Sequence, residues 1–280
     1  MVRGSGTANN IIRGDVVSAG LNGLIDNLTA TSSAYAHTIK NSKIDGDAYY
    51  KSISNTTVLG TLYPGSLDPA TSTLPITDEQ IEEWKQVALD GGVITTPCPY
   101  KITGPVTIGP IKINCDLEIS GTNYTVTLAG NVWVAGNIEI QNSPTIRVAA
   151  SFGNKGVVMI ADKPSNQTTS SKIELENSAI FEGSGSPGSH VMFISQNRSA
   201  ESGGGEVAID VKNTVSGDLL VYAGHGEIML QNNINLKEVS AYRIRLKNTA
   251  EVIYETGVID LIFDSGPSGG YEILSWDEIE

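Results

Sequence analysis

Apolar and polar residues alternate along most of the chain, and this alternation predicts β-strands. Val, Ile or Leu alternates with Thr, Arg, Asn or Glu in segments such as Tyr124–Leu128 and Ile244–Leu246. A period of two is typical of strands that bury one face and expose the other. We therefore expect a mainly β protein.

A turn residue recurs directly after many of these strands. The pattern apolar, any, apolar, any, Asn first ends at Asn142 and next at Asn177, and we interpret that gap and the following one as doubled steps. Other copies of the pattern end in Asp or Gly in place of Asn. When they are included, successive turn residues lie about 18 residues apart on average, and Asp264 closes the series. The predicted structural turn residues are Gly104, Gly121, Asn142, Asp162, Asn177, Asn197, Asn213, Asn232 and Asn248.

Asn, Asp and Gly share a tolerance of the left-handed backbone region, so such a series indicates one corner that each turn of the chain revisits. Asn side chains stacked at that corner can also hydrogen-bond to one another. Stacking of this kind predicts a right-handed parallel β-helix of about nine to ten coils, each rising about 4.8 Å. Chance spacing in an Asn-rich strand protein is the alternative.

Two cysteines occupy equivalent places in this scheme. Cys98 lies six residues before Gly104, and Cys115 lies six residues before Gly121. Adjacent coils would bring their Cα atoms within the range of about 4.4 to 6.8 Å that a disulfide requires. A disulfide would place the protein in an oxidising compartment, and two buried free thiols are the alternative.

The segment Thr77–Gly91 carries the one strong helix signal in the sequence. Thr77 and Gln80 form a capping box, and Ile81, Trp84 and Ala88 fall on one face. We expect this helix to cover the open end of the β-helix. The predicted divisions are residues 1–76 as an N-terminal strand and loop segment with a linker, 77–91 as the capping helix, 92–265 as the β-helix and 266–280 as a C-terminal cap.

Composition and charge exclude some classes of binding partner. The chain has 280 residues, with 18 basic against 31 acidic residues and a net charge of -13. Nucleic acids and anionic membranes attract basic surfaces, so neither is an expected partner. The longest apolar run, Val157–Ala161, is far shorter than the roughly 20 residues that cross a bilayer, and we expect any anchor or signal to lie upstream of Met1.

Right-handed β-helices often carry polysaccharide hydrolases and lyases, so the sequence was compared with that chemistry. Asn213-Thr214, Gly224-His225-Gly226 and Arg243-Ile244-Arg245 resemble polygalacturonase motifs. Glycoside hydrolysis needs two carboxylates that flank the scissile bond, but Val215 stands where the first family Asp is expected and only Asp218 is near. We therefore predict no catalytic residues.

Neither a metal site nor a cofactor site is predicted. Glu174, Glu176 and Asp210 alternate on neighbouring strands, where stacked acids bind Ca²⁺ loosely or simply form the solvated face. His37, His190 and His225 lack the spacing of a metal site. The Gly-rich segment Ser202–Glu206 is followed by neither a phosphate-binding Lys nor a helix, which indicates a loop.

Several short scaffold motifs occur along nearly the whole chain. They are paired Ile-x-Gly-Asp units at Ile12 and Ile44, Tyr63–Ser66 with Asp68-Pro69, Leu74–Thr77 before the helix, Val132–Val134 with Gly136–Ile138, and Tyr254–Gly257 with Ser265–Pro267. Together these motifs resemble the ectodomain of PilX-like, type IV pilus-associated surface proteins of candidate phyla bacteria.

The resemblance implies a secreted or surface-anchored structural module, with other pilin or cell-envelope proteins, or a surface glycan, as partners. The expected function is therefore a non-catalytic extracellular structural or adhesive module. A carbohydrate-active enzyme on a β-helix and a self-polymerising, bactofilin-like solenoid are the two alternatives.

Overall fold

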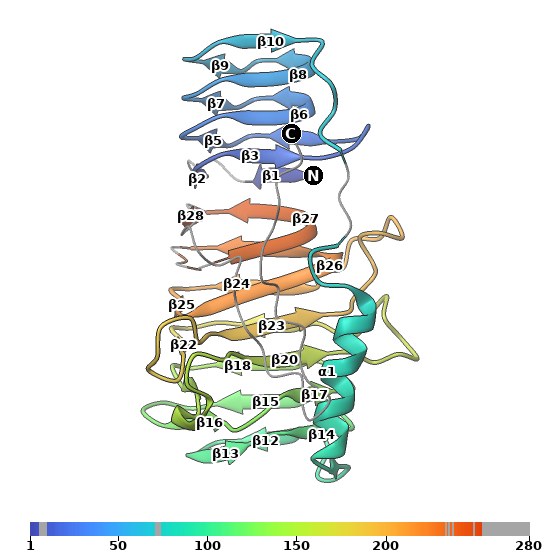
Figure 1. Ribbon diagram of the computed structural model, residues 1–280, viewed down its shortest axis with the longest axis vertical. Coiled ribbons are helices and arrows are strands. Elements are labelled where there is room, and N and C mark those ends of the chain that lie inside the picture. The colour runs from blue at the N-terminus through green and yellow to red at the C-terminus, as the bar shows by residue number, and fades with distance from the viewer. Residues whose placement is uncertain are drawn as a thin grey trace.

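The computed structural model describes residues 1–5, 10–70, 74–232, 234, 236, 238–248 and 250–253. The described chain is mainly β, with a single α-helix, and every strand pair within it is parallel (Figure 1). Long parallel sheets of this kind are compatible with a parallel β-helix or solenoid. The predicted C-terminal cap, 266–280, lies outside the described residues, as does Asp264.

The largest sheet has 18 strands and bends around two sides of the molecule. Its members are β1 (Val2–Ser5), β3 (Val16–Ser18), β4 (Leu24–Asp26), β6 (Ala34–Lys40), β8 (Ala48–Ser54), β10 (Leu62–Pro64), β11 (Val93–Ile94), β12 (Tyr100–Ile102), β14 (Ile111–Ile113), β15 (Leu117–Ser120), β17 (Val132–Val134), β18 (Ile138–Gln141), β20 (Val157–Ala161), β21 (Ile173–Leu175), β23 (Val191–Ser195), β24 (Ile209–Lys212), β26 (Leu219–Gln231) and β27 (Glu238–Lys247).

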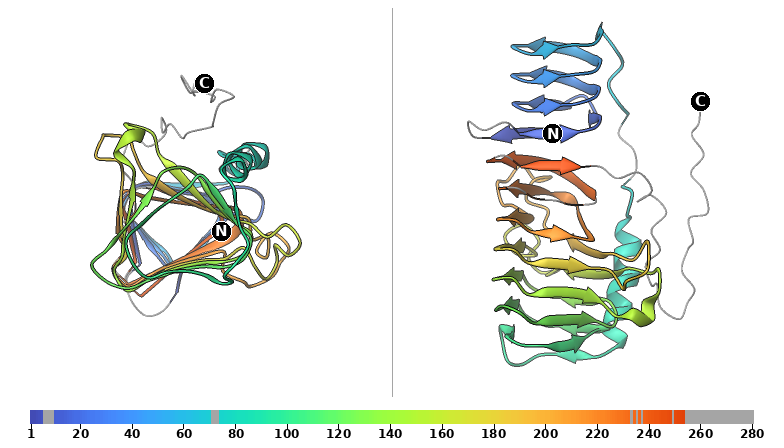
Figure 2. Two further views of the ribbon diagram at one scale, coloured as in Figure 1. Left: turned by 90° about the horizontal axis from the view of Figure 1, so that it is seen from below. Right: turned by 90° about the vertical axis from the view of Figure 1, so that its left-hand side faces the viewer.

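Two five-stranded sheets form the third side. One contains β13 (Val106–Ile108), β16 (Thr125–Leu128), β19 (Thr145–Val148), β22 (Ile180–Glu182) and β25 (Ser216–Gly217). The other contains β2 (Ile11–Arg13), β5 (Thr29–Ala30), β7 (Lys43–Ile44), β9 (Thr57–Val58) and β28 (Glu251–Ile253). A short 3-10 turn, Ala150–Phe152, follows β19. Seen along the stack, the strands outline a triangle (Figure 2).

The two long steps in the turn series are single steps, which corrects the predicted coil count. Ile138 of β18 pairs directly with Ile173 of β21, and Ile173 pairs with Ile209 of β24. The extra residues lie between the strands of one level, for example between β20 and β21. The prediction failed because a loop excursion of about one coil length is indistinguishable from an added coil by spacing alone.

The first 64 residues continue the same stack, but out of sequence order. Strand β1 pairs with β27 from Val2↔Ile244 to Ser5↔Lys247, and β2 pairs with β28. Residues 1–64 thus follow residue 253 in space, although they precede residue 92 in the chain (Figure 1). In sequence, residues 65–91, which include the helix, connect the two parts. The expected strand and loop segment is therefore part of the β-stack itself.

Within residues 24–64 the step between levels is shorter and more regular than in the rest of the stack. Tyr35 stacks on Tyr49 and Tyr49 on Tyr63, with ring centroids 4.5 and 4.4 Å apart, on the outer surface. Their side chains recur every 14 residues, as do Asn41 and Asn55, whose side chains hydrogen-bond at 2.9 Å. Residues 24–40 therefore contain three strands, β4, β5 and β6.

The helix α1 (Asp78–Asp90) runs along one side of the stack (Figure 2). Thr77 caps its first turn by accepting from the Gln80 N–H at 3.2 Å. Ile81 and Trp84 pack on outward-facing side chains, among them Ile160 and Ile194. The predicted position across an open end is wrong. Strands β20 and β23 are apolar on both faces, and it is their outer face that this helix buries.

The core lies inside the three sides and is aliphatic. Val, Ile and Leu of successive levels stack on one another, and Phe181 meets Phe193 edge to face at 5.3 Å. The N-terminal part has its own buried cluster, which includes Ile25, Ile39 and Ile44. Each strand thus buries alternate residues and exposes the others, which leaves in-register polar rows along the outside.

Candidate functional site

An acidic row runs along the outer face of one side of the stack. Its members occupy one register position on four successive strands: Glu118 of β15, Glu139 of β18, Glu174 of β21 and Asp210 of β24. Because parallel strands lie about 4.8 Å apart, the four carboxyl groups are stacked close together. We refer to these four residues as the acidic row.

Among the described residues, two lysines form ion pairs with the acidic row. Lys101 binds Glu118 at 2.6 Å, and Lys212 contacts Glu176, Glu174 and Asp210 at 3.1, 3.4 and 3.7 Å. Although burial opposes it, this group of carboxylates raises the pKa of Lys212. Lys212 is therefore held as a cation in the middle of the acids.

The carboxyl groups in turn perturb one another. Burial, followed by the charges of Glu174 and Glu118, raises the pKa of Glu139. Burial also raises the pKa of Asp210, although hydrogen bonds from Gln231 and Lys212 oppose the shift. The acidic row thus has an excess of negative charge that its own cations do not neutralise.

Glu139, Glu174 and Glu176 lie close enough together to hold a cation. One carboxylate oxygen from each lies within 4.8 Å of the others. Oxygen ligands suit Ca²⁺, but all three side chains are at least partly exposed, and acidic groups of that kind are common on strand surfaces without an ion. This cluster is therefore described as part of the acidic row.

The predicted turn residues fall into two groups. Gly121, Asn142, Asn177, Asn213, Asn232 and Asn248 all have positive φ, and the Asn values lie between 54° and 67°. The amide of Asn213 donates to Asn177 at 3.0 Å, and Asn232 donates to Asn213 at 2.8 Å. Asn177, Asn213 and Asn232 therefore form a hydrogen-bonded Asn ladder at one corner of the triangle.

Gly104, Asp162 and Asn197 do not share that conformation, because positive φ is found at none of the three. Asp162 follows β20 and Asn197 follows β23, so both lie at a different corner from the Asn ladder. Asn197 is fully buried and donates to the Ser170 carbonyl at 2.7 Å. Asp162 and Asn197 entered the predicted series because the long steps were divided, whereas Gly104 entered as a Gly version that precedes the Asn residues.

Asp162 is instead the buried partner of the helix. The ammonium group of Lys85 lies 2.7 Å from Asp162 and 2.6 Å from Glu82, and it lies 4.6 Å from the centroid of the Trp133 ring. Lys112 covers the same ring at 3.8 Å. A charge pair this deeply buried stabilises the docked helix only while both partners are present.

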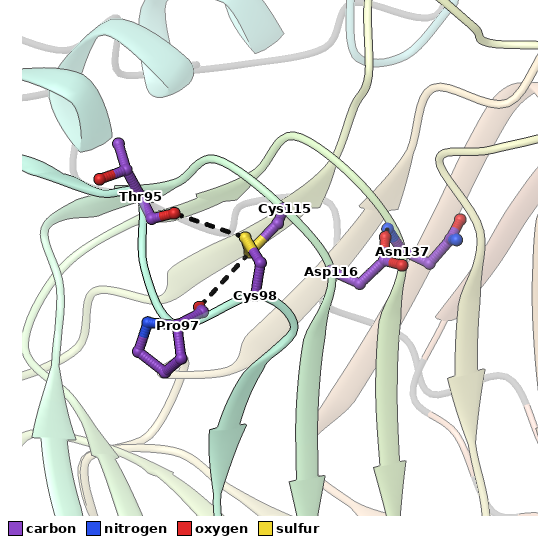
Figure 3. The surroundings of a disulfide bond; sticks show 6 residues. All are labelled: Thr95, Pro97, Cys98, Cys115, Asp116 and Asn137. Carbon is purple, nitrogen blue, oxygen red and sulfur yellow. Dashed lines mark hydrogen bonds between the residues drawn. A yellow bond between two sulfur atoms is a disulfide. The ribbon is translucent and has the colours of Figure 1, made fainter.

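Cys98 and Cys115 form a disulfide between neighbouring levels at the β12 end of the stack (Figure 3). Their Cα atoms lie 5.9 Å apart, within the expected range. On the next level, Asp116 accepts a hydrogen bond from the Asn137 N–H at 2.7 Å. Covalent and polar links therefore fasten the first levels of residues 92–148.

His225 and Asp218, which were considered with the polygalacturonase-like motifs, have different partners. His225 contacts Asp78 at 3.1 Å and Glu201 at 2.9 Å, whereas the Asp218 carboxylate accepts from the Gly183 N–H. Although burial opposes the shift, hydrogen bonds from His225 and Arg198 lower the pKa of Asp78. This network fixes the start of α1 to strand β26.

The other singled-out residues lie apart from the acidic row. Burial raises the pKa of Tyr222 to about 12, and its hydroxyl donates to the Ile76 carbonyl at 2.7 Å. His37 binds Asp68 of the connecting segment at 3.0 Å, and His190 precedes β23. Of the helices in the described part of the chain, none has the length and apolar character needed to span a membrane.

The chain was compared with protein families, with curated proteins and with solved structures. No family model, no curated protein and no solved structure matches this chain.

Proposed function

We propose that this protein is a non-catalytic extracellular structural or adhesive module, whose three parallel sides close into a right-handed β-helix. The handedness follows from the strong preference of parallel crossovers for right-handed connections. Residues 1–64 join the end of residues 92–253 by main-chain hydrogen bonds, such as Ile244 N–H to the Met1 carbonyl at 3.0 Å. The observation that carries the proposal is the continuous strand pairing of the 18-stranded sheet, which crosses this joint and has a register shift between Ala223 and Glu227.

The dimensions suit a spacer. From β12 through β15, β18, β21, β24, β26, β27, β1, β4 and β6 to β8, roughly ten steps of about 4.8 Å give a rod roughly 50 Å tall. Its outer rows, including the acidic row, offer repeating polar side chains to a partner. The disulfide supports an oxidising, extracellular setting.

Association with a pilus or another cell-surface structure is the specific role that we propose. It is tested by protease treatment of intact cells that express the tagged natural protein, with a cytoplasmic protein as the control. Loss of the tag signal from intact cells supports the proposal, and protection until the cells are lysed contradicts it. Small-angle scattering of the purified protein tests the rod separately.

A carbohydrate-active enzyme is separated from this proposal by an activity screen on pectic and uronic polysaccharides. Asp218→Ala and His225→Ala are the variants to compare. Turnover by the wild-type chain that is lost in both variants would overturn the non-catalytic assignment.

Self-polymerisation is a second candidate, because one end of the stack exposes apolar side chains. Leu59, Leu62 and Tyr63 at the β9–β10 end are 64%, 51% and 40% exposed. A terminal parallel strand with exposed apolar residues is a template for pairing with another chain. Filaments of purified protein in electron micrographs would favour this candidate over a monomeric spacer.

A further inference from the structure

A groove with basic walls lies where the two parts of the stack join. Its volume is about 500 Å³, it is open to solvent, and β1, β4, β6 and β27 contribute to it. Its polar lining includes Arg3, Ser5, Asn27, Lys40, Asn41 and Arg245. We call this feature the junction groove.

Two buried carboxylates hold the cations of the junction groove in place. Asp26, with 3% of its side chain exposed, lies 3.2 Å from Arg3 and 3.7 Å from Lys40. Glu227, with 1% exposed, lies 3.1 Å from Arg243 and 2.8 Å from Arg245. Each acid therefore orients two cations whose outer parts remain in solvent.

The charges of this group do not cancel. Arg3, Lys40, Arg243 and Arg245 give four positive charges against the two negative charges of Asp26 and Glu227, which leaves two positive charges in a chain of net charge -13. Arg3 and Arg245 are also direct register partners on neighbouring strands. Like charges placed opposite one another destabilise a sheet, and an anion bound between them would offset that cost.

We propose that the junction groove binds a short acidic oligosaccharide through its carboxylate or sulfate groups. Guanidinium groups suit such anions because they donate paired hydrogen bonds. Ser5, Asn27 and Asn41 line the groove beside the cations. Each already donates one hydrogen bond within the protein, to Leu246, Gly4 and Asp26, but hydroxyl and amide groups have more than one hydrogen-bonding position and are suited to sugar hydroxyls. This inference rests on the proposed surface role, for which it names the class of ligand.

The acidic row limits the length of the ligand. It occupies the same outer face as the groove, and Met229, the register partner of both Asp210 and Arg245, separates the two. A long polyanion along this face would meet four carboxylates, whereas a short acidic oligosaccharide would contact the cations alone. This arrangement favours a few sugar units over an extended nucleic acid.

Isothermal titration calorimetry with three hexasaccharides tests the proposal. Hexagalacturonate carries carboxylates, a heparin hexasaccharide carries sulfates as well, and maltohexaose is neutral. We expect at least one acidic probe to bind and maltohexaose not to bind. Arg3→Gln and Arg245→Gln should each weaken binding at least tenfold, and Lys40→Gln should weaken it less.

Lys101→Gln is the matched control, because Lys101 is a basic residue of the same outer face that lies beyond the acidic row and pairs with Glu118. If Arg3→Gln or Arg245→Gln alters the fold by circular dichroism, Lys40→Gln serves as the test, since it leaves the Arg3–Asp26 and Arg245–Glu227 pairs intact. An unchanged affinity in a folded Lys40→Gln variant, an equal loss in Lys101→Gln, or no binding of either acidic probe would overturn the proposal.

A hexameric oligothymidylate separates sugar recognition from general attraction to polyanions. Binding of that probe as tight as that of the acidic sugars would also contradict the proposal. The proposed spacer function is measured independently, by scattering and by surface exposure. A rod that reaches the cell surface but binds no probe would therefore refute the ligand class alone.

Discussion

At the scale of single residues, the Asn ladder combines a backbone requirement with side-chain hydrogen bonds. Asn213 has φ 60°, and its side chain both donates to Asn177 and accepts from Asn232. A non-glycine residue other than Asn or Asp is costly in this region because its Cβ approaches backbone atoms. The ladder therefore makes two separable contributions to stability.

The variants Asn213→Ala and Asn213→Gly separate these contributions. Ala loses the hydrogen bonds and also strains the backbone, so we expect the free energy of unfolding to fall by about 2 to 3 kcal/mol. Gly keeps the backbone free and should cost about half as much. Denaturant unfolding measures both, and equal losses in the two variants would show that the positive φ contributes nothing.

Lys85 illustrates the cost of breaking a buried ion pair. Lys85→Met keeps the apolar stem but leaves Asp162, which is 1% exposed, with an uncompensated charge. We expect a loss of about 3 to 5 kcal/mol in the free energy of unfolding. The double variant Lys85→Met with Asp162→Asn should recover part of this loss, and no recovery would indicate that the charge of Asp162 is not the cause.

At the scale of whole elements, polar rows are a consequence of register. Because parallel strands pair residue for residue, a Glu on one strand lies beside the Glu or Asp of the next. Like charges at such positions oppose folding. The acidic row therefore keeps a charged surface at some expense of stability, which fits a face that meets a partner.

Glu139→Gln tests that statement. In the wild-type protein, folding raises the pKa of the Glu139 carboxyl. Ionisation of this carboxyl therefore destabilises the folded state at any pH above the ordinary pKa of Glu. We expect the variant to gain roughly 0.2 to 1 kcal/mol at pH 7. This gain in stability should shrink as the pH falls from the raised pKa of folded Glu139 to its ordinary pKa in the unfolded chain. Below the ordinary pKa the gain should vanish, because the Glu139 carboxyl is then neutral in both states.

Melting temperatures of the two chains at pH 7 and pH 3.5 measure this effect. Lys212→Gln is the comparison variant, because it removes a cation from the same group and should lower the melting temperature at pH 7. If Glu139→Gln is the less stable protein at pH 7, the like-charge explanation fails.

The strands and the Asn turns were predictable because both rest on local rules. Period-two alternation located β16 and β27, and Asn after a strand located the corner at Asn142. The side packing of α1 was missed, although the unbroken apolar run Val157–Ala161 indicates a strand buried on both faces. The 14-residue recurrence of Tyr35, Tyr49 and Tyr63 is likewise present in the sequence, but it does not belong to the series of Asn, Asp and Gly turns.

The sites depended on information that no local pattern contains. Register between distant strands brings Arg3 beside Arg245, 242 positions apart, and folding the helix against the side brings Lys85 to Asp162. The alternation of apolar and polar residues placed Glu174 and Asp210 on a solvated face. It did not show which strands lie next to theirs in the sheet. Pairing order across a sheet is a tertiary choice, so it had to come from the structure.

At the scale of the whole molecule, the unusual feature is a stack whose sequence order and spatial order differ. The joint between β27 and β1 carries no direct chain connection, so it depends on pairing alone. Gly4 of β1 lies against the N-terminal part on its other side, where a Cβ would be 1.9 Å from the Asn27 carbonyl oxygen and 2.6 Å from the Asn10 side-chain nitrogen. The seating of β1 between β27 and the Asn27 backbone therefore requires glycine.

Gly4→Val should open this joint while the rest of the stack remains folded. Amide hydrogen exchange should accelerate in 244–247, which lose β1 as a partner strand, but remain slow in 117–148. Gly104→Val is the matched control, because its added Cβ meets no atom within 4 Å, and we expect no change. Slow exchange throughout the Gly4→Val variant would mean that the joint tolerates the side chain. Acceleration along the entire stack would mean that the two parts fold as one cooperative unit, which the separate buried clusters at Ile25 and Ile119 argue against.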